Sequence, residues 1–268
     1  MLLALDVGNT NAVIGLFRLG VDGAKAEVIT NWRITTPNEL TVDEFGMLLQ
    51  QMFTLRGLKT ELVTGVAISS VVPPLDSMMR KGCEVYFGVK PLFIEPGVKT
   101  GIPVLTDNPS EVGADRIVNC AAAYEEYGGP TIVVDMGTAT TFDVISKKGE
   151  FIGGAIAPGL GISANALFAR AARLPRIDIK KPAKVIGTNT VDHMQIGLYY
   201  GYIGLLDGIL ERMIAELGPE TKTVATGGLA KLIAGGSKYI AVVDEMLTLN
   251  GLRIIYERNL DRNKRRGA

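Results

Sequence analysis

The sequence predicts an α/β protein built from two similar halves. Strand-like apolar runs alternate with helix-like stretches, which is the order expected of mixed sheets flanked by helices. Two stretches, LALDVGNTNAVIGLF at Leu3–Phe17 and TIVVDMGTATTFDVIS at Thr131–Ser146, share one pattern: an apolar strand, an aspartate, a glycine turn and a returning strand. Asp135 follows Asp6 by 129 residues (135 − 6), close to half of the 268-residue chain. This spacing indicates an internal duplication.

After the first hairpin, the spacing of apolar residues alternates between that typical of strands and that typical of helices. We expect a strand over Glu27–Ile34 and a helix over Thr41–Leu55, whose apolar residues have helical spacing and whose first residue can cap it. The apolar run at Leu62–Val72 predicts a parallel strand, because two prolines follow it and open a helix that runs to about Gly82. Val85–Ile94 is typical of an edge strand.

A loop rich in glycine and proline, Glu95–Pro109, and a helix over Ser110–Gly128 connect the halves. We place the boundary there, which gives an N-terminal half of residues 1–112 and a C-terminal half of residues 113–268. Beyond its hairpin, the second half predicts a helix that ends at about Arg173 and a long helix over Val191–Leu217. A short strand over Thr221–Thr226, a helix from Leu229 and a last helix over Met246–Glu257 follow.

Composition narrows the class of protein. Apolar residues make up 47% and charged residues 21% of the chain, as in soluble globular proteins. Lysine plus arginine equal aspartate plus glutamate at 28 each, so charge gives no case for binding nucleic acid or a membrane surface. The sequence has no apolar run long enough for a transmembrane helix and no basic leader. With two distant cysteines, Cys83 and Cys120, we expect a cytoplasmic protein with reduced thiols.

The two aspartate turns are the first candidate site. A carboxylate at the end of a buried strand is costly unless it is paired, and a bound cation would pair it. Gly8 allows a ligand to approach the backbone, and the polar residues Asn9–Asn11 offer donors for phosphate oxygens. Each turn alone could be an ordinary Asx turn. Their repetition half a chain apart favours two acidic turns, at Asp6 and Asp135, that face one cleft and hold a metal-bound polyphosphate.

Asp115 is the candidate catalytic residue. The stretch NPSEVGADR places it in the first turns of a helix beside Arg116, where the helix amides and the guanidinium both favour an ionised carboxylate. An ionised aspartate can accept the proton of an attacking hydroxyl. The alternative is an acid that merely complements the helix dipole. Arg116 could hold a substrate carboxylate or pair with Glu111.

Glycines mark two further places. Thr226–Gly228 ends a strand and opens a helix, where glycine leaves room for a flat ring or simply allows close packing. Four glycines, spaced by four, three and four residues, share one face of the long helix; they are Gly197, Gly201, Gly204 and Gly208. Because each costs about 1 kcal/mol relative to alanine in a helix, we expect another helix or sheet to approach closely there. A dimer seam is the alternative.

These motifs together resemble those of type III pantothenate kinases. The resemblance covers Leu3 to about Glu257 and rests on motifs in the family's order. They are DVGNT at Asp6, GADR at Gly113, DMGTATT at Asp135, GGAIAPG at Gly153, IGTNT at Ile186 and TGG at Thr226. It implies two ribonuclease H-like domains of the actin-like ATPase superfamily, with mixed sheets flanked by helices. The implied activity is ATP-dependent phosphorylation of pantothenate to 4′-phosphopantothenate, the first step of coenzyme A biosynthesis.

The resemblance also implies roles for individual residues. ATP would contact Thr138, Gly227, Gly228 and the first turn, which consists of Asp6, Val7, Gly8, Asn9, Thr10, Asn11, Ala12 and Val13. Pantothenate would contact Thr190 and the GADR segment, which is Gly113, Ala114, Asp115 and Arg116, with Asp115 as general base. Asp135 would bind a monovalent cation, K⁺ or NH₄⁺, and Asp6 would serve Mg²⁺ with ATP. A homodimer is implied as well.

Two alternatives to this kinase activity stay open. One is a non-catalytic regulatory paralogue on the same fold, which the joint presence of Asp6, Asp115 and Asp135 argues against. The other is a different small-molecule kinase of the superfamily. One departure concerns the acceptor: many family members carry an aromatic residue directly before the DNP of Asp107–Pro109, where this chain has Thr106.

Overall fold

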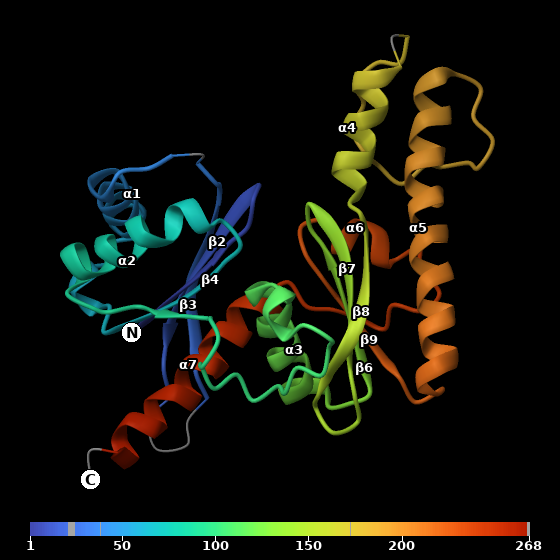
Figure 1. Cartoon of the computed structure of the whole chain (residues 1–268). Coiled ribbons are helices and arrows are strands. Elements are labelled where there is room, and N and C mark those ends of the chain that lie inside the picture. Colours follow the sequence, from blue (N-terminus) through green and yellow to red (C-terminus); the bar gives the residue numbers. More distant parts are fainter. Residues whose placement is uncertain (21–24, 38, 172, 267–268) are drawn as a thin grey trace. The chain divides into compact units, whose positions relative to one another are not determined.

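The computed structural model describes residues 1–20, 25–37, 39–171 and 173–266, with the backbone alone over 261–266. The chain forms two compact units (Figure 1). The first comprises residues 1–101, 108–122 and 248–268, and the second comprises residues 102–107 and 123–247. These units are not the contiguous stretches 1–112 and 113–268, because the chain returns to the first unit at its end.

The first unit contains a five-stranded sheet in the order β3-β2-β1-β4-β5. Strands β1 (Leu2–Val7), β2 (Asn11–Arg18) and β3 (Glu27–Thr35) form an antiparallel meander, and β4 (Gly65–Ser70) and β5 (Leu92–Phe93) add in parallel. The expected edge strand over Val85–Ile94 is wrong. Helix α2 (Pro73–Phe87) continues through Val85 and ends at Gly88, whose φ of 64° closes it, so only two residues are left to pair as β5.

Helices cover both faces of this sheet. Helix α1 (Val42–Thr54) begins with a capping box, in which Glu44 N–H donates to Thr41 Oγ1 and Thr41 N–H donates to Glu44 Oε2. Helices α1 and α2 pack on one face through a core that includes Leu5, Phe53 and Ile68. On the other face lies helix α7 (Leu247–Arg266): an added Cβ on Gly15 would come within 2.9 Å of its Leu249. Helix α7 extends past the predicted end at Glu257.

The second unit repeats the same sheet. Its order is β10-β9-β6-β7-β8, with β6 (Thr131–Met136), β7 (Ala139–Ile145) and β8 (Phe151–Pro158) as the meander. Strands β9 (Lys222–Thr226) and β10 (Val242–Val243) add in parallel, as β4 and β5 do. The predicted α/β class with two similar mixed sheets is therefore confirmed.

Helices connect the strands of the second unit. Helix α4 (Leu160–Arg170) follows β8, and the long α5 (Thr190–Leu217) runs beside the sheet (Figure 1). Short helix α6 (Ala230–Ala234) and helix α5 pack on one face through Val134, Phe142 and Leu206. Helix α3 (Ala114–Tyr127) is divided between the units after Ala122 and is preceded by a 3₁₀ turn, Pro109–Glu111, rather than beginning at Ser110.

Candidate active site

The first turn joins β1 to β2 and presents polar groups to solvent. Asp6 is half-buried at the end of β1, whereas Asn9 and Thr10 are exposed. Gly8 N–H donates to Asn11 O at 3.1 Å, and Thr36 fastens the turn from outside, since its Oγ1 donates to Gly8 O at 2.6 Å. A turn fixed in this way can offer its side chains to a ligand at little entropic cost.

The second turn joins β6 to β7 and is one residue shorter than the first. Asp135 lies opposite Thr141, as Asp6 lies opposite Val13. Asp135 is half-buried, Gly137 and Thr138 are exposed, and Gly137 N–H donates to Ala139 O at 3.0 Å. The alternation of burial therefore repeats around both aspartates, although the turns differ in length by one residue.

Two glycines pack against this second turn. Gly159 N–H donates to Thr138 O at 3.2 Å, and a Cβ on Gly159 would lie 2.2 Å from that same oxygen. Gly227 has a φ of 95°, and its Cβ would lie 2.7 Å from Asp135 Oδ1. Any larger residue at either place would displace the turn or the carboxylate. The exposed Gly228 follows Gly227.

Asp115 lies in the first turn of α3, as predicted, but its electrostatics differ from the expectation. Burial raises the pKa of the Asp115 carboxyl, and this effect outweighs the Arg116 N–H that donates to Oδ1 at 2.8 Å and the Arg116 charge, both of which lower the pKa. The prediction that the helix amides and Arg116 favour the ionised form thus identified the groups that lower the pKa. It missed desolvation, which raises the pKa and has the larger effect.

The surroundings of Asp115 connect it to the sheet edge at which the first turn emerges. A Cβ on Gly113 would lie 2.5 Å from Asp115 Oδ1 and 3.6 Å from Val71. Val71 directly follows β4, and its N–H donates to Val7 O at 3.1 Å. Asp115 and the first turn are therefore at the same end of β1 and β4 within the first unit, and Gly113 leaves room for the carboxylate.

Comparison with known proteins identifies the family. A family model described as type III pantothenate kinase matches residues 2–212. The chain belongs to the type III pantothenate kinase family. A curated relative of that name from Acidobacterium capsulatum is 63% identical over 257 residues, which cover 96% of this chain and 94% of the relative.

Solved structures show the fold. One, described as a Baf family transcriptional activator from Campylobacter jejuni, has a TM-score of 0.59 at 21% identity and covers 97% of this chain and 99% of its own. Another, described as an N-acetylmannosamine kinase from Listeria monocytogenes, has a TM-score of 0.52 at 12% identity and covers 96% and 99%. The actin-like ATPase fold expected of the type III pantothenate kinase family is confirmed.

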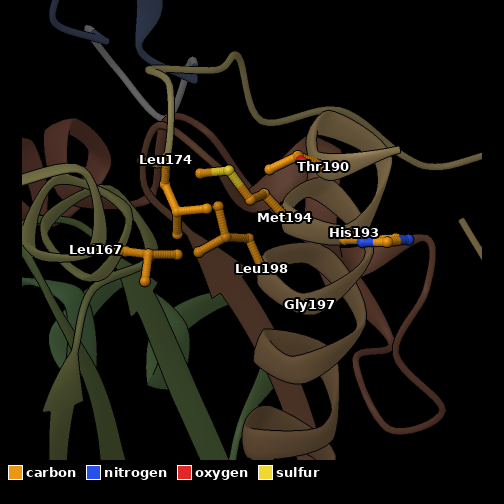
Figure 2. Close-up of a pocket in the computed structure, with 7 residues that line it drawn as sticks. All are labelled: Leu167, Leu174, Thr190, His193, Met194, Gly197 and Leu198. Carbon is orange, nitrogen blue, oxygen red and sulfur yellow. The ribbon is translucent and has the colours of Figure 1, made fainter. Parts of the chain in front are cut away.

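Thr190, the second acceptor residue that the family motifs predict, is the exposed first residue of α5. It lines a cavity of about 480 Å³ between α4 and α5. Figure 2 shows the side chains of Leu167, Leu174, Met194 and Leu198 converging in this cavity, which is therefore mostly apolar. His193 lies at its edge and pairs locally, with Nε2 3.1 Å from Gly187 O.

Polar atoms without partners mark places that the sequence did not identify. Ser69 lies beside Asp6 in the register of β4 and β1, is fully buried, and its Oγ finds no hydrogen-bond partner among the described residues. Thr106 Oγ1, at the site of the missing aromatic, is likewise buried and unpartnered within the described part of the chain. Nothing in the local sequence pattern distinguishes these hydroxyls from ordinary strand and loop residues.

The carboxylates have the chemistry that a phosphate-bound cation needs. Mg²⁺ in kinases is held by one or two carboxylates together with substrate phosphates, and Asp6 and Asp135 are half-buried acids at turns with exposed donors. Over the described ranges, no group of three or more histidine, cysteine or acidic side chains could hold a metal. In the same ranges, every helix is too short or too polar to span a bilayer.

The predicted residues fall into two sets. The first turn and Gly113–Arg116 belong to the first unit, whereas Asp135, Thr138, Thr190, Gly227 and Gly228 belong to the second. The structure brings Asp115 to the first turn's sheet edge, and it brings Asp135, Thr138 and Gly227 together. Sequence reasoning left Gly159 without a contact. Its place in the GGAIAPG motif, one residue before a helix, was the available signal.

Proposed function

We propose that this chain transfers the γ-phosphoryl group of ATP to the terminal hydroxyl of pantothenate, giving 4′-phosphopantothenate. Membership of the type III pantothenate kinase family supports the reaction. The observation that carries the mechanism is the half-buried Asp115 carboxylate at the sheet edge from which the first turn emerges, where Gly113 leaves room for it and the Arg116 N–H donates to it.

In this mechanism Asp115 is the general base. The pantothenate hydroxyl oxygen attacks the γ-phosphorus and its proton passes to an Asp115 carboxylate oxygen, while the bond to the bridging oxygen breaks and ADP departs. A base works best when its pKa lies near the working pH. Burial raises the pKa of Asp115 toward the working pH. The desolvation that disfavours the ionised carboxylate therefore also makes it a stronger base.

The remaining groups position the substrates. The first turn, Asp6–Val13, and Thr138 would contact the ATP phosphates, and Gly227 and Gly228 would lie against the adenosine. Asp6 would hold Mg²⁺ and Asp135 a monovalent cation, K⁺ or NH₄⁺; these ions neutralise the charge that builds up on the phosphates. Arg116 would bind the pantothenate carboxylate and Thr190 a second part of the acceptor.

We further propose a homodimer formed through α5. A Cβ added to Gly197, Gly201 or Gly204 would meet nothing within 4 Å, so no other part of the described chain makes the expected close approach. Exposed apolar side chains occur on both α4 and α5, at Ile162 and Val191. Glycines that cost helix stability and face open space suit the backbone of a second copy. Replacing Gly201 by leucine should then convert dimer to monomer in light scattering.

The kinase reaction is tested by coupled ADP release with and without pantothenate, and with and without K⁺. We expect release to require pantothenate and to rise with K⁺. ADP release that ignores pantothenate would favour another small-molecule kinase, and its absence under all conditions would favour a regulatory paralogue. We place the reaction in the cytoplasm, since Cys83 and Cys120 are buried thiols outside any disulfide.

A further inference from the structure

Tyr202 is a buried phenol on α5 that meets two elements of the second turn's support. Its hydroxyl is hydrogen-bonded to Thr140 Oγ1, two residues beyond Thr138 on β7, and Thr140 is itself fully buried. Tyr202 also packs in the same core cluster as Leu160, the first residue of α4. A buried hydroxyl that pairs with another buried hydroxyl is costly to remove.

These contacts close a ring around the turn. From Thr138 the chain runs to Thr140, whose hydroxyl is hydrogen-bonded to Tyr202. Tyr202 packs in one core cluster with Leu160, and the neighbouring Gly159 N–H donates back to Thr138 O at 3.2 Å. Every member belongs to the second unit. Thr138 therefore cannot shift without breaking a hydrogen bond in which a buried group takes part.

We infer that Tyr202 is a positioning residue that holds the Thr138 turn in the conformation that receives the ATP phosphates. The inference rests on the proposed role of that turn. Tyr202 does not contact the substrate itself but acts through its bond to Thr140 and its packing with the start of α4. Burial raises the pKa of the Tyr202 phenol, and the Asp135 charge adds to this rise. The phenol thus stays protonated and can donate to Thr140.

The same helix provides a matched control. Tyr199 lies one turn before Tyr202, is 1% exposed against 6% for Tyr202, and its hydroxyl donates to Leu232 O at 3.4 Å. Tyr199→Phe removes a buried hydroxyl from α5 without touching the ring around Thr138. A change that affects Tyr202→Phe alone is thus specific to the ring.

The experiment compares Tyr202→Phe, Thr140→Val, Thr140→Ser and Tyr199→Phe with the unmodified chain. We expect Tyr202→Phe and Thr140→Val each to weaken binding of a non-hydrolysable ATP analogue in calorimetry and to raise the KM for ATP, each by about tenfold, the effect of one hydrogen bond. The KM for pantothenate should stay within about twofold. Thr140→Ser keeps a hydroxyl and should lose less than Thr140→Val, and Tyr199→Phe should leave the ATP terms unchanged.

Several outcomes separate the possibilities. The combined Tyr202→Phe and Thr140→Val variant should be no worse than either alone, because both remove the same bond. If Tyr202→Phe lowers Tm as Tyr199→Phe does and leaves ATP-analogue binding unchanged, the inference is wrong. Thr138→Ala separates failure of the inference from failure of the proposed function. If Thr138→Ala impairs ATP binding and Tyr202→Phe binds ATP normally, only the inference is refuted. If both variants bind ATP normally, the proposed role of the turn is refuted. If Tyr202→Phe does not fold, Thr140→Val carries the test.

Discussion

The two aspartate turns follow equivalent strands of the two sheets but are supported by different parts of the chain. Around Asp6, Thr36 directly after β3 fastens the turn through Gly8 O, at 2.6 Å. Around Asp135, helices provide the support: Gly159 before α4 bonds Thr138 O, and Tyr202 of α5 bonds Thr140. The duplication thus preserved the sheet, while the two halves came to hold their turns differently.

The halves also differ in the helix that follows the last short strand of each sheet. Helix α3 follows β5 and has Asp115 in its first turn, whereas α7 follows β10 and has no acid there. The acidic turn thus belongs to the sheet and is present in both halves. The candidate base belongs to the start of one helix and is present in one half.

Replacing Asp115 by asparagine should have the largest effect. Loss of a general base should reduce kcat by about a thousandfold, measured by coupled ADP release at saturating ATP and pantothenate. Asp43→Asn is the control, since Asp43 is also a first-turn acid of a helix in the first unit but accepts from Tyr86 Oη at 2.6 Å. An Asp115→Asn variant with full activity would remove α3 from the chemistry.

The pH dependence of the same residue has a defined sign. The pKa of Asp115 is raised in the folded chain above the ordinary value of 3.8. The folded state then binds more protons between these two pKa values, so stability falls as pH rises through that window and the cost persists above it. Asp115→Asn should therefore raise Tm at neutral pH and give no increase below the unfolded pKa. A Tm difference that does not vary with pH would contradict burial as the cause.

The pH profile of activity should follow the same group. kcat/KM should fall as pH decreases through the raised pKa of Asp115, because the protonated carboxyl cannot accept the hydroxyl proton. The acid limb should thus lie above that of an ordinary aspartate.

Gly159→Ala should damage the second turn without affecting the first. The new Cβ would lie 2.2 Å from Thr138 O and 2.6 Å from Gly137 O, so the turn must shift, and we expect kcat/KM for ATP to fall by about tenfold or more. Gly161→Ala, two residues on in α4, meets nothing within 4 Å and should raise stability by about 0.5–1 kcal/mol. Equal ATP kinetics in the two variants would show that the helix support of this turn is dispensable.

Two buried hydroxyls should give the smallest effects, with opposite signs. Ser69→Ala in the first unit removes an Oγ with no partner in the described chain and should stabilise by about 1 kcal/mol. Thr223→Val in the second unit removes a hydroxyl that donates to Tyr239 O and accepts from Ala241 N–H at 3.0 Å; it should destabilise by about 2 kcal/mol. Denaturant unfolding checks both. A destabilising Ser69→Ala would mean that this hydroxyl is satisfied in solution.

Prediction from sequence succeeded where the signal is local and periodic. The apolar run and prolines around β4 and α2, the Thr41 cap of α1 and the extent of α5 all follow from neighbouring residues. It failed at Val85, which has strand character but lies within α2, because the helix that opens at Pro73 continues until the positive φ of Gly88 ends it. The glycine face of α5 was expected to be covered within the chain and is open.

The sequence was sufficient to predict the duplicated sheets, the aspartate at the end of each central strand and the position of Asp115 in the first turn of a helix. These depend on the order of apolar, acidic and glycine residues along a few turns of chain. Folding is needed to make burial the main influence on the pKa of Asp115, and to bring Tyr202 to Thr140 and into one core cluster with the start of α4. The physical reason is that desolvation and long-range hydrogen bonds depend on residues brought together by folding, so no local pattern encodes them.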